Sequence, residues 1–438
     1  MDQHEVSGAG RGLSTPLVLL VSLLSSVPVL AQPSVEATAF LENADAVGVA
    51  EAVVLWRNLE DPDASRILVA EGAGGVVHYA LDGTDPQALT PAQNVSGLAI
   101  THHGGGLAEG QAMVATVSRD TAELLFHLLR FNDEGVPESV SQHAMTRGGD
   151  AALGYESANS LAFSVGPDGR LFLFVAFPNE IEQLELGLGE EGPERLASTS
   201  RPLLGAEKLL TSDASGSFVY AAAEEGGISE VSSDPDAPDG FLQVFSPLDV
   251  GFLNGLAMDT RTATAGTPAY LLTSNGITNT LRIFEPLADP PRFVQSFQVL
   301  SGNGQIPAPV AGLALTTEPV GTLFPEGLLV VTTGTTGSRR GALVSWGDVA
   351  RSFDPPLFFV EEGSGGEPDG GTGGDGGEDG GTDGGTNNPN NPVPGGPDIA
   401  LPQLPREDVG CGCTGAGSLS TVSLLLGSGL FLLRRRRR

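Results

Sequence analysis

The feature that most constrains this sequence is a short apolar hairpin pattern that recurs along the chain. In residues 65–83, an apolar run over 67–70 meets a glycine-rich turn, and a second run over 76–81 ends at the tight-turn pair Asp82-Gly83. Short β-branched runs with this punctuation predict an antiparallel hairpin. One hairpin cannot bury an apolar face alone, so the pattern is informative because roughly six such units follow one another.

These repeats predict an all-β fold, a six-bladed β-propeller. Each unit has a short run followed by two longer strands, and four of the short runs share a Gly-Leu-Ala-like motif, at residues 97–100, 160–163, 255–258 and 312–315. Several strands per unit at a period of roughly 40 to 50 residues are typical of a propeller. A β-sandwich with insertions, the alternative, explains the repeated motif less well. We expect the blades at residues 53–81, 95–131, 160–186, 209–244, 255–299 and 312–346.

The charge and the cysteine content of the chain limit which classes of function are possible. The formal net charge is −32, Lys208 is the one lysine, and five of the arginines form the C-terminus, so the body is more acidic still. This composition excludes nucleic-acid binding, and an anionic substrate would need a metal bridge or local arginines. The two cysteines, Cys411 and Cys413, lie outside the predicted core, so we expect a propeller without an internal disulfide. We also expect the protein to be a monomer.

The N-terminus predicts export. Arg11 precedes an apolar run, and Val29 and Ala31 supply the small residues of a cleavage site, so residues 1–31 are interpreted as a signal peptide that ends at Ala31. Residues 32–361 then form the propeller domain. Residues 362–409 are rich in Gly, Asp and Pro and contain almost no apolar residue before Val393, which predicts a disordered acidic stalk. Calcium binding by its Asp-Gly-Gly repeats is the less favoured alternative.

The C-terminal residues 410–438 predict attachment to the cell surface. Cys411 and Cys413 precede an apolar stretch of 20 residues over 414–433 and then the arginine run. Such a stretch can span a bilayer, and the arginines would stay on the cytoplasmic side. The segment resembles the myxobacterial-type C-terminal sorting signal, which implies processing near the cysteines by the cell-envelope sorting machinery and a place at the cell surface or outer membrane. An ordinary transmembrane tail anchor gives nearly the same location.

The body resembles the β-propeller phytases (3-phytases) over most of residues 45–350. The resemblance rests on the stretches 73–83, 220–228 and 270–276 and is strongest from residue 324 to residue 346. It implies a hydrolase that holds several Ca²⁺ ions with carboxylates at one mouth of the propeller and releases phosphate from phytate, myo-inositol hexakisphosphate. Because Ca²⁺ takes six to eight oxygen ligands, such a site needs many convergent acidic side chains.

Several of the acidic positions of that family are missing here. The family's opening acidic motif falls on residues 51–56, where Glu51 remains and Ala52 replaces a carboxylate, and both acids are lost at residues 252–255 and again at 309–312. The resemblance leaves Arg119 as the catalytic candidate, a phosphate clamp. It leaves three candidate Ca²⁺ ligands, Glu51, Glu207 and Glu224.

Each candidate also has a structural interpretation without function. Arg119 lies in a polar turn where a solvated arginine is ordinary, and Glu207 beside Lys208 can form a surface ion pair of little energetic weight. Glu224 can belong to a solvated turn. The adjacent pair His102-His103 does not face one way on a strand, which disfavours a shared metal.

We therefore predict an exported, surface-held, phytase-like propeller that is weakly active or inactive towards phytate. The alternatives are a working Ca²⁺-dependent phosphomonoesterase, a binding or adhesion propeller that uses its rim loops, and, third, a lactonase-type propeller. Acids gathered at one mouth would favour the enzyme. A neutral or apolar mouth, as Phe252, Val310 and Ala311 suggest, would favour binding.

Overall fold

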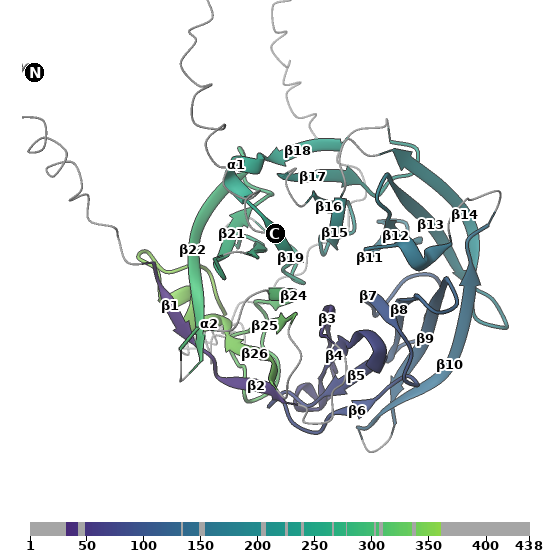
Figure 1. The fold of residues 1–438 in the computed structure, drawn as a ribbon, viewed down its shortest axis with the longest axis horizontal. Coiled ribbons are helices and arrows are strands. Elements are labelled where there is room, and N and C mark those ends of the chain that lie inside the picture. The colour runs from purple at the N-terminus through teal and green to yellow at the C-terminus, as the bar shows by residue number, and fades with distance from the viewer. Residues whose placement is uncertain are drawn as a thin grey trace, which may run out of the picture. The chain divides into compact units, whose positions relative to one another are not determined.

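The computed structural model of the protein describes residues 32–42, 49–132, 135–148, 154–202, 207–223, 227–237, 241–264, 267–276, 278–301, 304–305, 310–334 and 339–360. These residues form six β-sheets arranged as blades around a central axis (Figure 1). The predicted fold class, an all-β six-bladed propeller, is confirmed. The predicted signal peptide, stalk and C-terminal segment lie outside the described residues, and so do Ala31, Cys411 and Cys413.

The first three blades are antiparallel sheets of four strands each, written here from the inner to the outer strand. Blade A comprises β3 (Ala52–Trp56), β4 (Arg66–Ala70), β5 (Val76–Tyr79) and β6 (Gln87–Ala88). Blade B comprises β7 (Val95–Thr101), β8 (Gln111–Ser118), β9 (Glu123–Phe131) and β10 (Pro137–Thr146). Blade C comprises β11 (Ser160–Val165), β12 (Leu171–Ala176), β13 (Glu180–Leu188) and β14 (Pro193–Pro202).

The last three blades repeat this order. Blade D comprises β15 (Glu207–Ser212), β16 (Phe218–Ala223), β17 (Gly227–Ser232) and β18 (Phe241–Phe245). Blade E comprises β19 (Leu253–Met258), β20 (Leu271–Asn275), β21 (Leu281–Glu285) and β22 (Arg292–Ser301), and the short β23 (Gly304–Gln305) pairs with β22. Blade F comprises β24 (Val310–Thr316), β25 (Leu328–Thr333) and β26 (Arg339–Ser345).

The N-terminal segment closes the ring. Strand β2 (Ala39–Glu42) pairs antiparallel with β26 and is the outer strand of blade F, so the first and last parts of the described chain share one sheet (Figure 1). Just before it, β1 (Ser34–Glu36) adds to the edge of blade E, parallel to β22. Every blade therefore has four principal strands, where the sequence predicted three. The predicted ranges of blades A, B and C end before the outer strand, whereas those of blades D and E extend into β18 and β22.

The core lies between neighbouring blades because successive side chains of a strand point to opposite faces of its sheet. On β5, Val77 and Tyr79 pack towards blade F with Leu41 of β2, whereas Val76 packs towards blade B with Leu129 of β9. Each blade thus contributes one apolar face to each of two interfaces. This arrangement explains why the middle strands read as continuous apolar runs in the sequence.

Helices are short and occur at the edges of the blades. Among the described residues, the α-helices are α1 (Pro247–Val250) and α2 (Trp346–Arg351), and 3₁₀ helices occur at Pro62–Ala64, Gly72–Gly74 and Tyr155–Ser157. A capping box at Ser246 and Asp249 fixes the start of α1. A search of the described residues for a membrane-spanning helix finds none.

Candidate functional site: the central channel and its two mouths

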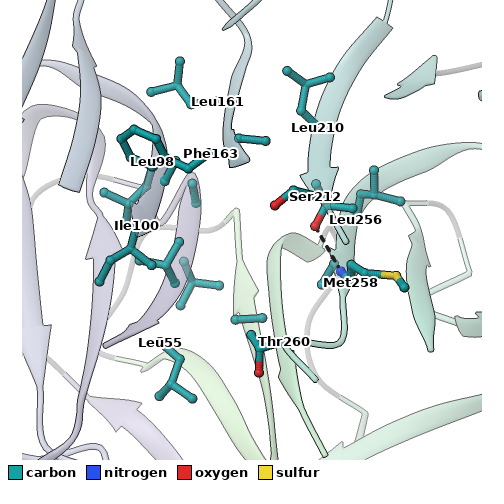
Figure 2. A pocket seen from close by; sticks show the side chains of 18 of the residues that line it. Leu55, Leu98, Ile100, Leu161, Phe163, Leu210, Ser212, Leu256, Met258 and Thr260 are labelled. Carbon is teal, nitrogen blue, oxygen red and sulfur yellow. Dashed lines mark hydrogen bonds between the residues drawn. The ribbon is translucent and has the colours of Figure 1, made fainter. Parts of the chain in front are cut away.

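The six inner strands, β3, β7, β11, β15, β19 and β24, surround a central cavity of about 580 Å³. They run in the same direction around the axis, as the parallel bridge between Asp259 and Leu315 shows for blades E and F. The channel therefore has an N-mouth, where the inner strands begin, and a C-mouth, where they end. Its wall is mainly apolar (Figure 2), and residues from all six blades contribute, among them Leu55, Ile100, Leu161, Phe163, Leu210, Leu256, Met258 and Leu313.

The repeated Gly-Leu-Ala motif forms this wall. In blades B, E and F, the motif's glycine lies at a β-bulge where the inner strand begins. A Cβ on Gly97 would lie 3.3 Å from Cγ of Leu161, and a Cβ on Gly312 would lie 3.2 Å from Cα of Ala52. Glycine is thus required because the neighbouring inner strand approaches closely. The next residue, a leucine, then contributes to the channel wall.

Hydroxyl groups tie neighbouring inner strands together without placing charge on the wall. The backbone N–H of Leu210 donates to Ser160 Oγ at 3.1 Å, and the N–H of Met258 donates to Thr211 Oγ1 at 3.1 Å. These bonds link blade C to blade D and blade D to blade E. They satisfy backbone donors that face the neighbouring blade, so the channel keeps its shape.

The N-mouth brings together two of the predicted site residues. Arg119, in the turn after β8, contacts Glu51, which directly precedes β3, through two nitrogen–oxygen pairs at 3.2 Å and 3.1 Å. This is a fork-like ion pair between blades A and B. Burial raises the pKa of the Glu51 carboxyl, and the charge of Arg119 partly offsets that shift. The carboxylate predicted to bind Ca²⁺ and the guanidinium predicted to bind phosphate are partners of each other.

A second acidic residue at the N-mouth, Glu71, was not singled out from the sequence. It follows β4, is buried, accepts a hydrogen bond of 2.5 Å from the Tyr79 hydroxyl, and lies 3.8 Å from the guanidinium of Arg340 in blade F. The sequence did carry a signal, since an acid between an apolar run and a glycine turn is unusual unless it has a partner. Glu71 therefore links the first blade to the last.

The remaining predicted ligands are only partly described. Glu207 is the first residue of β15 and pairs with Ala223, the last residue of β16, so its backbone lies at the N-mouth, and its side chain is outside the described part of the structure. Glu224 lies outside the described residues altogether. Both remain predictions.

The described acidic side chains of the N-mouth are few and already have partners. Glu51 and Glu71 each face an arginine, and Ala52 and Ala311 stand where the resemblance calls for carboxylates. No group of three His, Cys, Asp or Glu able to hold a metal occurs among the residues that the structure describes. A Ca²⁺ ion needs six to eight oxygen ligands, and this set falls well short of that number.

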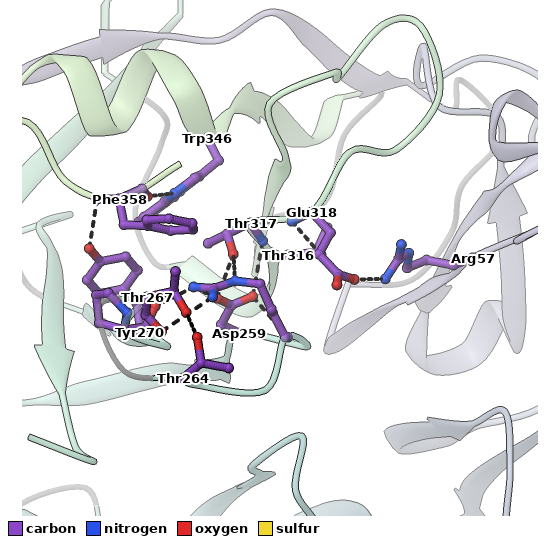
Figure 3. Close-up of polar contacts among 12 residues, drawn as sticks. Arg57, Asp259, Thr264, Thr267, Tyr270, Thr316, Thr317, Glu318, Trp346 and Phe358 are labelled. Atoms are coloured by element: carbon purple, nitrogen blue, oxygen red, sulfur yellow. Dashed lines mark hydrogen bonds and ion pairs between the residues drawn. The ribbon is translucent and has the colours of Figure 1, made fainter. Parts of the chain in front are cut away.

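The C-mouth is polar but has no free charge cluster in its described part. Arg57, just beyond β3, forms an ion pair with Glu318, just beyond β24 (Figure 3). Burial lowers the pKa of His102 to about 4, so this imidazole is neutral at physiological pH. Its neighbour His103 is exposed, so the two side chains are in different surroundings, as expected for adjacent positions.

A buried network fixes the chain after α2 against blades E and F (Figure 3). Asp259 accepts hydrogen bonds from the Thr317 hydroxyl at 2.7 Å and the Thr317 N–H at 3.0 Å, and burial raises its pKa. The guanidinium of Arg261 lies over the ring of Phe358 at 4.4 Å. The indole N–H of Trp346 donates to the Phe358 carbonyl at 2.9 Å. This network is structural, and it orders residues up to the end of the described chain.

Comparisons with known proteins leave the function open. No family model matches the sequence, and no curated protein matches it. Among solved structures, the chain is similar to BBS1N, crystallised in complex with ARL6DN and soaked with lead, with a TM-score of 0.40 and 12% identity, over 68% of this chain and 79% of that one. A likeness at this level carries no argument about function.

Proposed function

We propose that this protein is a binding propeller held outside the cell, with little or no phosphatase activity. One observation supports the proposal most directly. At the mouth where a phytase-like site would gather carboxylates, Glu51 is paired with Arg119, and the channel behind it is walled by apolar residues. The Glu51–Arg119 ion pair at this mouth connects blades A and B, and an apolar partner could be buried in the channel beyond it.

The export and surface attachment in this proposal rest on the sequence. Residues 1–31 resemble a signal peptide, and the cysteines, apolar stretch and arginine run of residues 410–438 resemble a sorting signal. An extracellular binding module on an acidic stalk is consistent with the strong negative charge of the chain.

A working Ca²⁺-dependent phosphomonoesterase is the second candidate, and one observation favours it. Glu51, Arg119 and the first residue of β15, Glu207, all lie at the N-mouth, although they are far apart in sequence. If a phosphate group displaced Glu51 from Arg119, the freed carboxylate could join other acids in binding a cation.

Phosphate release from phytate separates the two candidates. The full chain would be assayed with Ca²⁺ and with a chelator, beside Arg119→Ala and the control Arg292→Ala, which alters an arginine on the outer strand β22. We expect no Ca²⁺-dependent release and no rise in melting temperature on adding Ca²⁺. Ca²⁺-dependent release that is lost in Arg119→Ala and kept in Arg292→Ala would overturn the proposal and establish the phosphatase.

A further inference from the structure

We infer that the central channel is a binding site for an uncharged, hydrocarbon-rich small molecule. The inference names a ligand class for the binding function proposed above and rests on that function. It uses the channel wall, whereas the phytate assay examines the N-mouth, so each can fail separately.

The wall is the first reason. Ile100 of β7 and Val54 of β3 are partly exposed, and both line the cavity, as do the leucines of the Gly-Leu-Ala motifs. Water against the apolar part of this wall finds no hydrogen-bond partners there. Displacing poorly bound water with an apolar group is favourable, because the apolar surfaces of the wall and of the ligand are then both removed from contact with water.

The distribution of charge is the second reason. The charged lining residues described here, Glu51, Arg57 and Asp213, lie at the two mouths, and each already has partners. Arg119 contacts Glu51, Glu318 contacts Arg57, and Asp213 accepts the Phe218 N–H at 2.8 Å. A charged ligand inside the channel would lose its hydration without gaining a counter-charge. The net charge of −32 further disfavours anions.

The size of the channel and the polar groups at its C-mouth narrow the class of ligand. The volume of about 580 Å³ falls within the usual range of roughly 300 to 1,000 Å³ for small-molecule sites. Inner strands of 5 to 7 residues make the channel about 17 to 23 Å long, which suits an elongated molecule. Ser212 and Thr260 line its C-mouth half (Figure 2), so a neutral hydrogen-bonding end group would find hydroxyl partners there. A long-chain alcohol has this chemistry.

Photo-crosslinking tests the inference on the full chain. The probe is a twelve-carbon alcohol with a diazirine in mid-chain, and mass spectrometry locates its adducts. Two channel variants are compared with the wild type: Ile100→Asp places a charge on the wall, and Ile100→Trp narrows the channel at β7 while keeping it apolar. The matched control is Leu248→Asp, which makes the same kind of change at a side chain of α1 that is 94% exposed. Melting curves show that each variant is folded.

We expect adducts on the inner strands in the wild type and in Leu248→Asp, and at least about a tenfold lower yield in both Ile100 variants. If Ile100→Asp does not fold, Ile100→Trp alone decides. Adducts confined to residues 414–433, adducts spread over the outer surface, or an inner-strand yield unchanged in both Ile100 variants would overturn the inference. Ca²⁺-dependent phytate hydrolysis together with channel adducts would refute the proposed function and leave the channel site standing.

Discussion

Leu41 of β2 should control closure of the ring, and with it the existence of the channel. Its side chain is fully buried between blades F and A, in an apolar cluster that also contains Val53, Phe324 and Leu343. Replacing a buried leucine with alanine costs about 2.7 to 5 kcal/mol, and the cost is largest where the surroundings cannot collapse into the cavity. Here the neighbours belong to strands of two different blades, which limits collapse. We therefore expect Leu41→Ala to lower the free energy of unfolding by about 3 to 4 kcal/mol.

The measurement is urea unfolding of the full chain, followed by tryptophan fluorescence. The control is Leu242→Ala, the same deletion on the outer strand of blade D, where the side chain is 63% exposed; its cost should stay within about 0.5 kcal/mol. A second variant, Gly83→Ala, disturbs closure of the ring from blade A. A Cβ on Gly83 would lie 2.0 Å from the Phe40 carbonyl oxygen, and φ at Gly83 is +81°. If Leu41→Ala costs less than about 1 kcal/mol, or no more than Leu242→Ala, then β2 does not close the ring as described.

Three further predictions concern buried charge and hydrogen bonds. Burial lowers the pKa of His78 and of His127 from 6.5 to about 4. Below about pH 6.5 the unfolded chain therefore binds more protons than the folded chain, so each histidine should lower the free energy of unfolding by about 2 kcal/mol between pH 7 and pH 5. Melting temperatures across this range should fall less steeply when both are changed to Gln, and an unchanged slope would contradict the burial argument. Arg119→Ala should cost under about 1 kcal/mol at pH 7, because the pair with Glu51 is partly exposed. That cost should shrink on acidification as Glu51 takes up a proton, and urea midpoints at two pH values would show it; a cost independent of pH would mean that the pair does not form. Trp346→Phe leaves the Phe358 carbonyl without its indole donor and should cost about 1 to 3 kcal/mol, measured as a shift in urea midpoint, with no shift arguing against the contact.

The sequence predicted the fold class because the inner and middle strands are buried on both faces and read as apolar runs. It missed the outer strands of blades A, B, C and F, which are β6, β10, β14 and β2, for the opposite reason. Strand β10 has alternating exposed and half-buried residues, so no apolar run marks it. Strand β2 is only four residues long, and its partner β26 is about 300 residues away in the chain, a pairing that local pattern cannot reveal.

The site was predictable to a smaller extent. The placement of Arg119 and Glu51 at one mouth follows from topology, since the end of β8 and the start of β3 lie at the same mouth once the blades are arranged in a ring. What the sequence could not show is that the two candidates contact each other, because that depends on the twist and spacing of two separate blades. The sequence suggested an apolar or neutral mouth at Phe252, Val310 and Ala311, but of these three only Ala311 lines the described channel, whose continuity needs all six inner strands in place.

The polar contacts between blades explain why the wall can be apolar. Among the described residues, at least one polar contact crosses each blade boundary, from Glu51–Arg119 between A and B to Asp259–Thr317 between E and F. The boundary between F and A, where the chain closes on itself, has Arg57–Glu318 at the C-mouth and Glu71–Arg340 at the N-mouth. Charge at both ends of the channel is thus used to hold blades together, and the inner strands need no charged side chain to stay in register. Selectivity for a ligand must then come from the shape and polarity of the wall, because the described charged side chains that line the mouths, Glu51, Arg57 and Asp213, already have ion-pair or hydrogen-bond partners.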